Sequence, residues 1–165
     1  MRRLLLLLGL AACSHSPGPP QANPASAEGH LSLERRPCFG TCPVYTVTLE
    51  RSGAVIFEGR RFVADTGIHT ASIPAARADS LFRALDAAGW FAFADRYAMG
   101  EPGCQHFATD LPSVITEVRM EGRVKRVEHD HGCSDAPAAL DALERRIDEV
   151  TGVAKWVRPS SRPPA

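Results

Sequence analysis

The chain has 165 residues, with 19 lysines and arginines balanced by 19 aspartates and glutamates. A length of this order suits one globular domain plus terminal segments. The balanced charge gives no electrostatic basis for binding nucleic acid, because such proteins carry a strong basic excess. The sequence has no Gly-x-Ser-x-Gly, no His-Glu-x-x-His and no glycine-rich phosphate-binding loop. It therefore indicates no nucleic-acid partner, no cofactor and no particular enzyme class.

The N-terminal residues have the features of an export signal. Two arginines precede an apolar run at residues 4–10, which is shorter than the roughly 20 residues that a membrane-spanning helix needs. The run ends in Leu-Ala-Ala-Cys, which resembles the lipobox of bacterial lipoproteins. In that family the signal is cleaved before the cysteine, and the cysteine carries the lipid. The resemblance implies a signal peptide at residues 1–12 and a lipidated Cys13; an ordinary secreted protein with a chance cysteine is the alternative.

The segment after the signal is expected to be a flexible tether. Residues 13–28 hold four prolines among small and polar residues and show no apolar periodicity. A coil of this length spans about 20 Å. Ser14, rather than an aspartate, follows the cysteine, and by the lipoprotein sorting pattern this favours the outer membrane over the inner one. We therefore expect a lipid-anchored protein of the outer membrane that faces the periplasm or the cell surface, with a disordered tail at residues 158–165.

Residues 29–157 are expected to form one globular domain that begins with strands. The segment 44–49 is rich in β-branched and aromatic residues, with Tyr45, Val47 and Leu49 on one face. A Ser-Gly turn at 52–53 leads back into a partner strand. The expected strands of this antiparallel meander lie at residues 31–34, 44–49 and 54–58, with a looser arm within 61–73.

Two helices and a second hairpin follow the meander. A helix begins at Pro74 and ends at Gly89, and a second helix, capped by Ser134-Asp135, ends at Thr151-Gly152. Between them, residues 94–111 show no clear period, and residues 112–120 and 123–129 form a hairpin. The pattern predicts an α+β fold: an antiparallel β-sheet, made of a meander plus a second hairpin, with two helices packed on one face. The apolar stripes of the helices are Leu81, Phe82, Leu85 and Ala88, and Leu140, Leu143, Ile147 and Val150.

Four cysteines remain besides Cys13, and four cysteines allow three pairings. An exported chain meets an oxidising compartment, so disulfide bonds are the default expectation. We favour Cys38 with Cys42 and Cys104 with Cys133. The second pair would bracket the second hairpin and close a loop of about 30 residues, which would stabilise the fold by about 3–4 kcal/mol.

The cysteines also allow two metal-binding alternatives. The Cys38-x-x-x-Cys42-Pro motif resembles the copper-binding motif of periplasmic copper chaperones of the cytochrome oxidase assembly type, and His129 or His131 would add a ligand. In that family the motif opens a helix of a thioredoxin-like fold, whereas here a strand pattern follows. A zinc site would combine the two histidines with Cys104 and Cys133. Its spacing is unfamiliar, and His-x-His is also typical of a solvent-facing strand edge.

The order of motifs resembles a bacterial envelope family called domain of unknown function 6438. The chain carries Cys-Phe-Gly-Thr-Cys-Pro-Val-Tyr at 38–45, Asp-Arg-Tyr at 95–97, Thr-Asp-Leu-Pro at 109–112 and Gly-Arg-Val-Lys-Arg-Val at 122–127. The resemblance covers residues 31–150 and implies an exported or lipid-anchored single domain with no established activity.

No catalytic residue is indicated, but four side chains are candidates for binding. Tyr97, Asp110 and Lys125 fall within the motif-like stretches, and His106 lies in the segment 94–111. Irregular segments on a rigid scaffold often carry function. We expect a non-enzymatic module that binds or supports another envelope component or a ligand. The alternative is a periplasmic copper or thiol-redox protein that uses Cys38 and Cys42.

Overall fold

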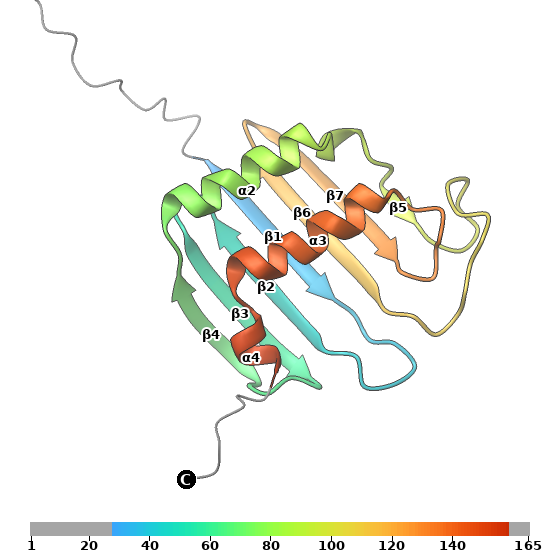
Figure 1. Ribbon diagram of the computed structural model, residues 1–165, viewed down its shortest axis with the longest axis horizontal. Helices are drawn as coiled ribbons and strands as arrows, with labels where there is room; N and C mark the ends of the chain where they lie inside the picture. Colours follow the sequence, from blue (N-terminus) through green and yellow to red (C-terminus); the bar gives the residue numbers. More distant parts are fainter. Residues whose placement is uncertain (1–27, 159–165) are drawn as a thin grey trace, which may run out of the picture.

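The computed structural model describes residues 28–158, so the expected signal peptide, Cys13, almost all of the tether and residues 159–165 lie outside the described part. The described chain builds a seven-stranded sheet in the spatial order β4-β3-β2-β1-β6-β7-β5 (Figure 1). The strands are β1 (Gly29–Arg35), β2 (Val44–Glu50), β3 (Ala54–Arg61), β4 (Gly67–Ser72), β5 (Arg96–Tyr97), β6 (Ser113–Met120) and β7 (Arg123–Asp130).

The sheet is mostly antiparallel, and the α+β class is confirmed. Strands β1 to β4 are antiparallel neighbours in chain order, as a meander requires. The β6–β7 hairpin adds to the free edge of β1. Strand β5 departs from the prediction because it pairs in parallel with β7, within a segment for which the sequence shows no period. Two residues are too few for apolar alternation to appear.

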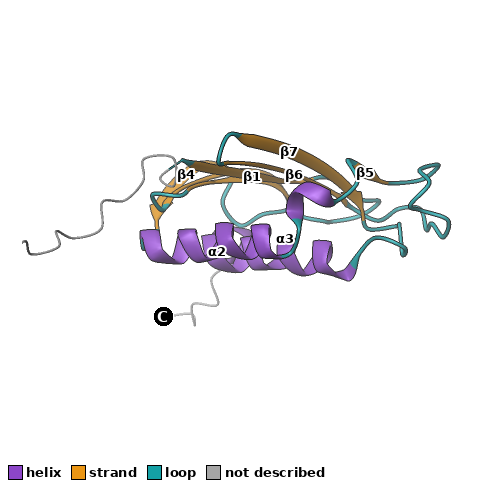
Figure 2. Cartoon of the chain, turned by 90° about the horizontal axis from the view of Figure 1, so that it is seen from above, coloured by secondary structure: helices purple, strands orange, loops and turns teal. Residues whose placement is uncertain are grey.

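Two helices, α2 (Ala75–Ala87) and α3 (Ala138–Thr151), lie on the same side of the sheet (Figure 2). Helix α2 starts directly after Pro74, as expected. The expected cap of α3 at Ser134-Asp135 is wrong, because the N-cap residue is Pro137. The sequence pattern also does not indicate the 3₁₀ turn η1 (Trp90–Ala92) or the short helix α4 (Ala154–Val157).

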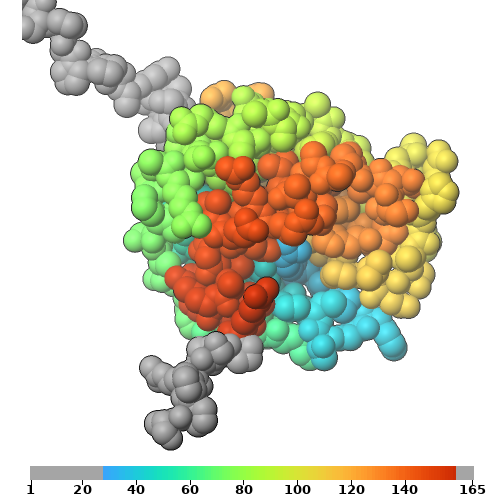
Figure 3. Space-filling view, in the orientation of Figure 1, coloured from blue at the N-terminus to red at the C-terminus, as the bar shows by residue number. Residues whose placement is uncertain are grey.

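The core lies between the sheet and the helices, where α2 and α3 cover the sheet side by side (Figure 3). Burial of one large apolar side chain stabilises a fold by about 1.5–3 kcal/mol. Helix α4 closes one end of the core, because Trp156 stacks on Phe57 with 4.9 Å between ring centroids. The largest fully buried apolar side chains are Trp90, Phe57, Phe82, Leu31, Leu33, Leu49, Leu81, Leu85, Leu140, Ile147 and Val47.

The helices of the described residues are too short or too polar to cross a membrane.

Gly152 ends α3 in the left-handed conformation, with φ of 70°. Its N–H donates to the carbonyl oxygen of Asp148 at 3.0 Å, which turns the chain into α4. We expect Gly152→Ala to lower the free energy of unfolding by about 1 kcal/mol, because a Cβ disfavours this conformation. An added Cβ meets no atom within 4 Å, so crowding contributes nothing. Chemical denaturation tests this, with Gly152→Asn as the control, which should cost less; equal stability of all three proteins would contradict it.

Candidate functional site

A row of polar side chains crosses the helix-covered face of the sheet. Arg35 of β1 lies opposite Tyr45 of β2 and Val114 of β6, and Val114 lies opposite His129 of β7. Residues opposite each other in a sheet point to the same face, so Tyr45, Arg35 and His129 all point toward the helices. Tyr97 of β5 extends the row beyond His129.

Helix α3 places two carboxylates over this row. Glu144 and Asp148 are four residues apart and therefore share one side of the helix. Glu144 lies in the buried stripe of α3 together with Leu140, Leu143 and Ile147. An acidic residue at a core position of an amphipathic helix is uncommon, because a buried charge is costly unless it is paired. A carboxylate at this position is the sequence signal that could have identified Glu144, which is not among the candidates named from the sequence.

Glu144 forms a buried cluster with two histidines. Its Oε1 lies 2.9 Å from Nδ1 of His129, and its Oε2 lies 2.9 Å from Nε2 of His131. The side chains of Glu144, His129 and His131 are 1%, 6% and 25% exposed. Burial opposes ionisation, but the hydrogen bonds from both imidazoles outweigh burial and hold the pKa of Glu144 below its ordinary value. The cluster therefore contains an ionised carboxylate in a largely dry environment.

The second carboxylate, Asp148, forms a closed set of polar contacts with β1 and β2. Arg35 donates to Asp148 at 2.5 Å and 2.9 Å, and Tyr45 donates to the other carboxylate oxygen at 2.8 Å. Arg35 also donates to the Tyr45 hydroxyl at 3.0 Å. Burial raises the pKa of Asp148, and the attraction of Arg35 does not fully offset it. Tyr45 and Asp148 line a hollow of about 280 Å³ that also borders α4.

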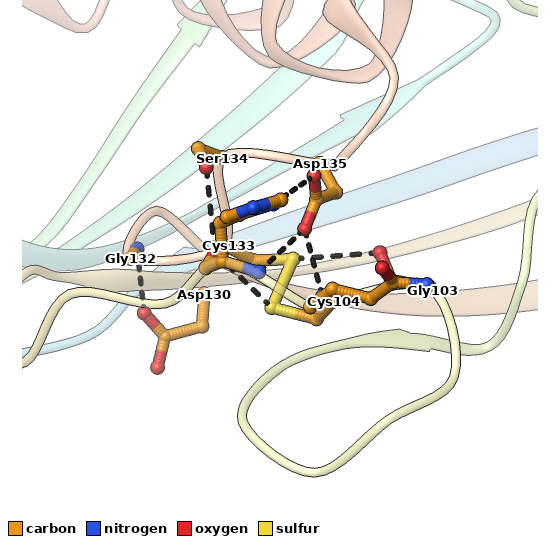
Figure 4. Close-up of a disulfide and its surroundings, with 9 residues drawn as sticks. Gly103, Cys104, Asp130, Gly132, Cys133, Ser134 and Asp135 are labelled. Atoms are coloured by element: carbon orange, nitrogen blue, oxygen red, sulfur yellow. Dashed lines mark hydrogen bonds and ion pairs between the residues drawn. A yellow bond between two sulfur atoms is a disulfide. The ribbon is translucent and has the colours of Figure 1, made fainter.

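The Cys104–Cys133 disulfide ties the loop after β5 to the turn after β7 (Figure 4). Cys133 follows His131 by two residues in the chain. This turn also docks on the loop through backbone hydrogen bonds, from Ala108 N–H to Gly132 O at 2.9 Å and from His131 N–H to Pro112 O at 3.0 Å. Gly132 allows this approach, because a Cβ there would lie 2.0 Å from the Ala108 oxygen. Several tight links therefore fix the segment that carries His131.

Asp135 stabilises the same loop instead of capping α3. Its carboxylate accepts hydrogen bonds from the backbone N–H groups of Gln105 and His106, both at 2.7 Å. These bonds join positions about 30 residues apart, which explains why a cap motif read locally fails here.

The four predicted binding residues do not form one site. Tyr97 is buried, and its ring forms a T-shaped pair with His129 at 6.4 Å between centroids. Lys125 pairs with Asp95, and the exposed His106 pairs with Asp135 at 2.9 Å. Asp110 is exposed, and its carbonyl accepts a hydrogen bond from Phe39. Only Tyr97 of the four contacts the buried cluster in the described contacts.

The cysteines of the described chain are all in disulfide bonds, which link Cys38 with Cys42 and Cys104 with Cys133. This is the expected pairing. It does not favour thiolate ligands for copper, nor the zinc set that combined Cys104 and Cys133 with the histidines. The interpretation of His-x-His as a solvent-facing edge is wrong for His129, which is buried.

The comparisons with known proteins bear on this framework. A search of curated proteins finds no match to the chain. The profile of the family described as "Domain of unknown function (DUF6438)" matches residues 30–151. The match spans the chain from β1 to the end of α3, so it includes both disulfide bonds and the buried cluster. Because it covers well over half of the 165 residues, the chain belongs to the DUF6438 family.

Proposed function

We propose that this protein is an exported, lipid-anchored cell-envelope protein whose domain acts as a non-enzymatic binding or structural module. The observation that carries the proposal is the combination of a lipobox-like sequence ending at Cys13 with two disulfide bonds in the domain. Disulfide bonds persist in oxidising compartments such as the periplasm and are rare in the cytosol. The two disulfide bonds of the domain therefore suit the oxidising compartment to which the proposed signal peptide would export the chain.

The position of the tether supports display of the domain away from the membrane. The tether enters the domain at Gly29, where β1 begins, and Arg35 lies at the opposite end of this strand. A strand rises about 3.3 Å per residue, so the two ends of β1 are about 20 Å apart. The polar row that contains Arg35 and His129 thus lies far from the attachment point. A ligand or envelope partner would reach that end of the domain without competing with the lipid bilayer.

The copper or thiol-redox alternative has less support. It needs thiolates at Cys38 and Cys42, and these residues are joined to each other. In the copper chaperones the cysteine motif opens a helix, whereas here strand β2 begins at Val44, directly after the motif.

Lipidation is tested by replacing Cys13 with alanine in a bacterial host that processes lipoproteins. We expect the wild type to incorporate a labelled fatty acid and to fractionate with the outer membrane, and Cys13→Ala to lose the label. The physical reason is that a lipid anchor binds by burying its acyl chains, at about 0.8 kcal/mol per buried CH₂. The measurement is labelling followed by membrane fractionation.

Two controls separate the parts of this proposal. Ser14→Asp should keep the label but move the protein to the inner membrane. The double variant Cys38→Ala/Cys42→Ala should be labelled as the wild type is, because these residues belong to the domain. A wild type without label, or a labelled Cys13→Ala variant, would refute lipid anchoring at this residue.

A further inference from the structure

We propose that His129, His131 and Glu144 form a binding site for a divalent transition-metal ion of the zinc type. Each residue offers one ligand atom, and the three ligand atoms all lie within 4.8 Å of one another. Nothing in the proposed envelope function depends on this site, and the two proposals succeed or fail separately.

The chemical types of the three ligand atoms favour zinc over calcium or magnesium. Two imidazole nitrogens and one carboxylate oxygen are a known ligand set for zinc, whereas calcium and magnesium prefer oxygen ligands alone. His129 directs Nδ1 and His131 directs Nε2 at the carboxylate. The centroids of the two rings lie 4.6 Å apart. The ligand atoms therefore converge on one small volume.

The distances require only a small adjustment. Zinc binds nitrogen and carboxylate oxygen at about 2.0–2.2 Å, so ligand atoms around a tetrahedral ion lie about 3.3 Å apart. The two nitrogen–oxygen distances are now 2.9 Å. The two contacts use different oxygens of Glu144, so a rotation of its carboxylate together with a small shift would place one oxygen and both nitrogens around one ion, starting from ligand atoms that lie within 4.8 Å of one another.

The charge of the cluster also favours a cation. Glu144 is buried, and its ion-pair partners in the described chain are only the two histidines. The nearby Asp148 has a guanidinium partner in Arg35, at 2.5 Å. A buried carboxylate needs compensation by a charge or a metal. A divalent ion bound to both nitrogens would supply this compensation, and each imidazole would then carry its proton on the ring nitrogen that faces away from the ion.

The frame of the site is rigid, and one side is open. His129 is held by its strand pairing to β6 and by the T-shaped ring contact with Tyr97. The Cys104–Cys133 disulfide and the backbone bond from His131 to Pro112 fix the following turn. Supporting contacts of this kind orient metal ligands. His131 is a quarter exposed, so an ion can enter from its side and keep a fourth position for water or another exchangeable ligand.

The test is a titration of the full chain, purified in detergent and freed of metal by chelation, with Zn²⁺ alone in a calorimeter. We expect one Zn²⁺ to bind per chain. Loss of a supporting residue around a metal site already weakens binding by about 10–100-fold, so His131→Gln and Glu144→Gln should each weaken it by about 100-fold or more. His30→Gln is the matched control, since His30 also pairs with a glutamate, Glu50 at 2.8 Å, but lies outside the cluster. It should bind as the wild type does.

X-ray absorption at the zinc edge of the wild-type complex adds a measurement that needs no variant to fold. Two imidazoles with oxygen ligands and no sulfur would support the site. No binding by the wild type, sulfur ligation, or equal binding by the wild type and His131→Gln would overturn the proposal. His131→Gln is the safer variant for this comparison because its side chain is the most exposed of the three.

Discussion

Replacing both Cys104 and Cys133 with alanine is expected to lower the free energy of unfolding by about 3–4 kcal/mol. The disulfide closes a loop with a sequence separation of 29, and its loss gives the unfolded chain more conformational freedom. The loop contains the β6–β7 hairpin, and both cysteines are buried. Denaturant unfolding without reductant measures the effect. The double variant avoids the unpaired thiol that a single replacement would leave.

The matched control is the second disulfide. Cys38 and Cys42 are separated by only four residues, so their bond should contribute about 2 kcal/mol on the same chain-entropy model. We therefore expect Cys38→Ala/Cys42→Ala to be more stable than Cys104→Ala/Cys133→Ala. Equal stability of the two variants would show that loop length is not the source of the stabilisation. Unchanged stability of the Cys104/Cys133 variant would show that the backbone bonds around Gly132 suffice.

Local signals in the sequence account for most of the elements. The alternation of Tyr45, Val47 and Leu49 predicts β2, because side chains in a strand alternate between faces. Pro74 predicts the start of α2, and Gly152 predicts the end of α3. Each of these signals acts within a few residues. The α+β class follows from them, since one-sided strands and one-sided helices must bury their apolar faces against each other.

The elements that sequence reasoning missed depend on contacts between distant positions. Strand β5 exists because Arg96 and Tyr97 pair with Glu128 and His129, about 32 residues further along. Aspartate is a residue type that often caps helices. The Asp135 carboxylate instead accepts hydrogen bonds from the backbone of the loop after β5. A local motif cannot show which of two competing partners a carboxylate will take.

The candidate site also depends on contacts between positions that are distant in the sequence. Tyr45, Arg35 and His129 come together because β2 pairs with β1, β1 with β6, and β6 with β7 in fixed registers. The register between β1 and β6 joins distant parts of the chain, and no spacing in the sequence predicts it. From the sequence, His129 and His131 could be recognised as possible metal ligands. Glu144 could have been found from the helix stripe, since it lies at a core position between Leu140 and Ile147. The pairing of Glu144 with the two histidines could not be predicted, because it depends on where α3 packs relative to β7 in the folded chain.

Removing Asp148 alone is expected to cost more than removing all three members of its polar set. In Asp148→Leu, Arg35 keeps its charge and Tyr45 keeps its hydroxyl, and both lose their partner in a largely buried place. Breaking a buried ion pair costs about 3–5 kcal/mol. The side chains of Arg35 and Asp148 are 18% and 20% exposed, so we expect the lower end of that range.

The triple variant Arg35→Met/Tyr45→Phe/Asp148→Leu leaves no polar group unpaired. Apolar residues of similar volume often replace a buried ion pair at little or no cost. We therefore expect this variant to unfold at a higher denaturant concentration than Asp148→Leu, although it carries two more changes. Tyr45→Phe alone should cost only about 1 kcal/mol, the usual contribution of one hydrogen bond. A triple variant less stable than Asp148→Leu would mean that the three residues stabilise the fold as a unit. The expected order would mean that burial of unpaired groups, and not attraction within the set, makes the single change costly.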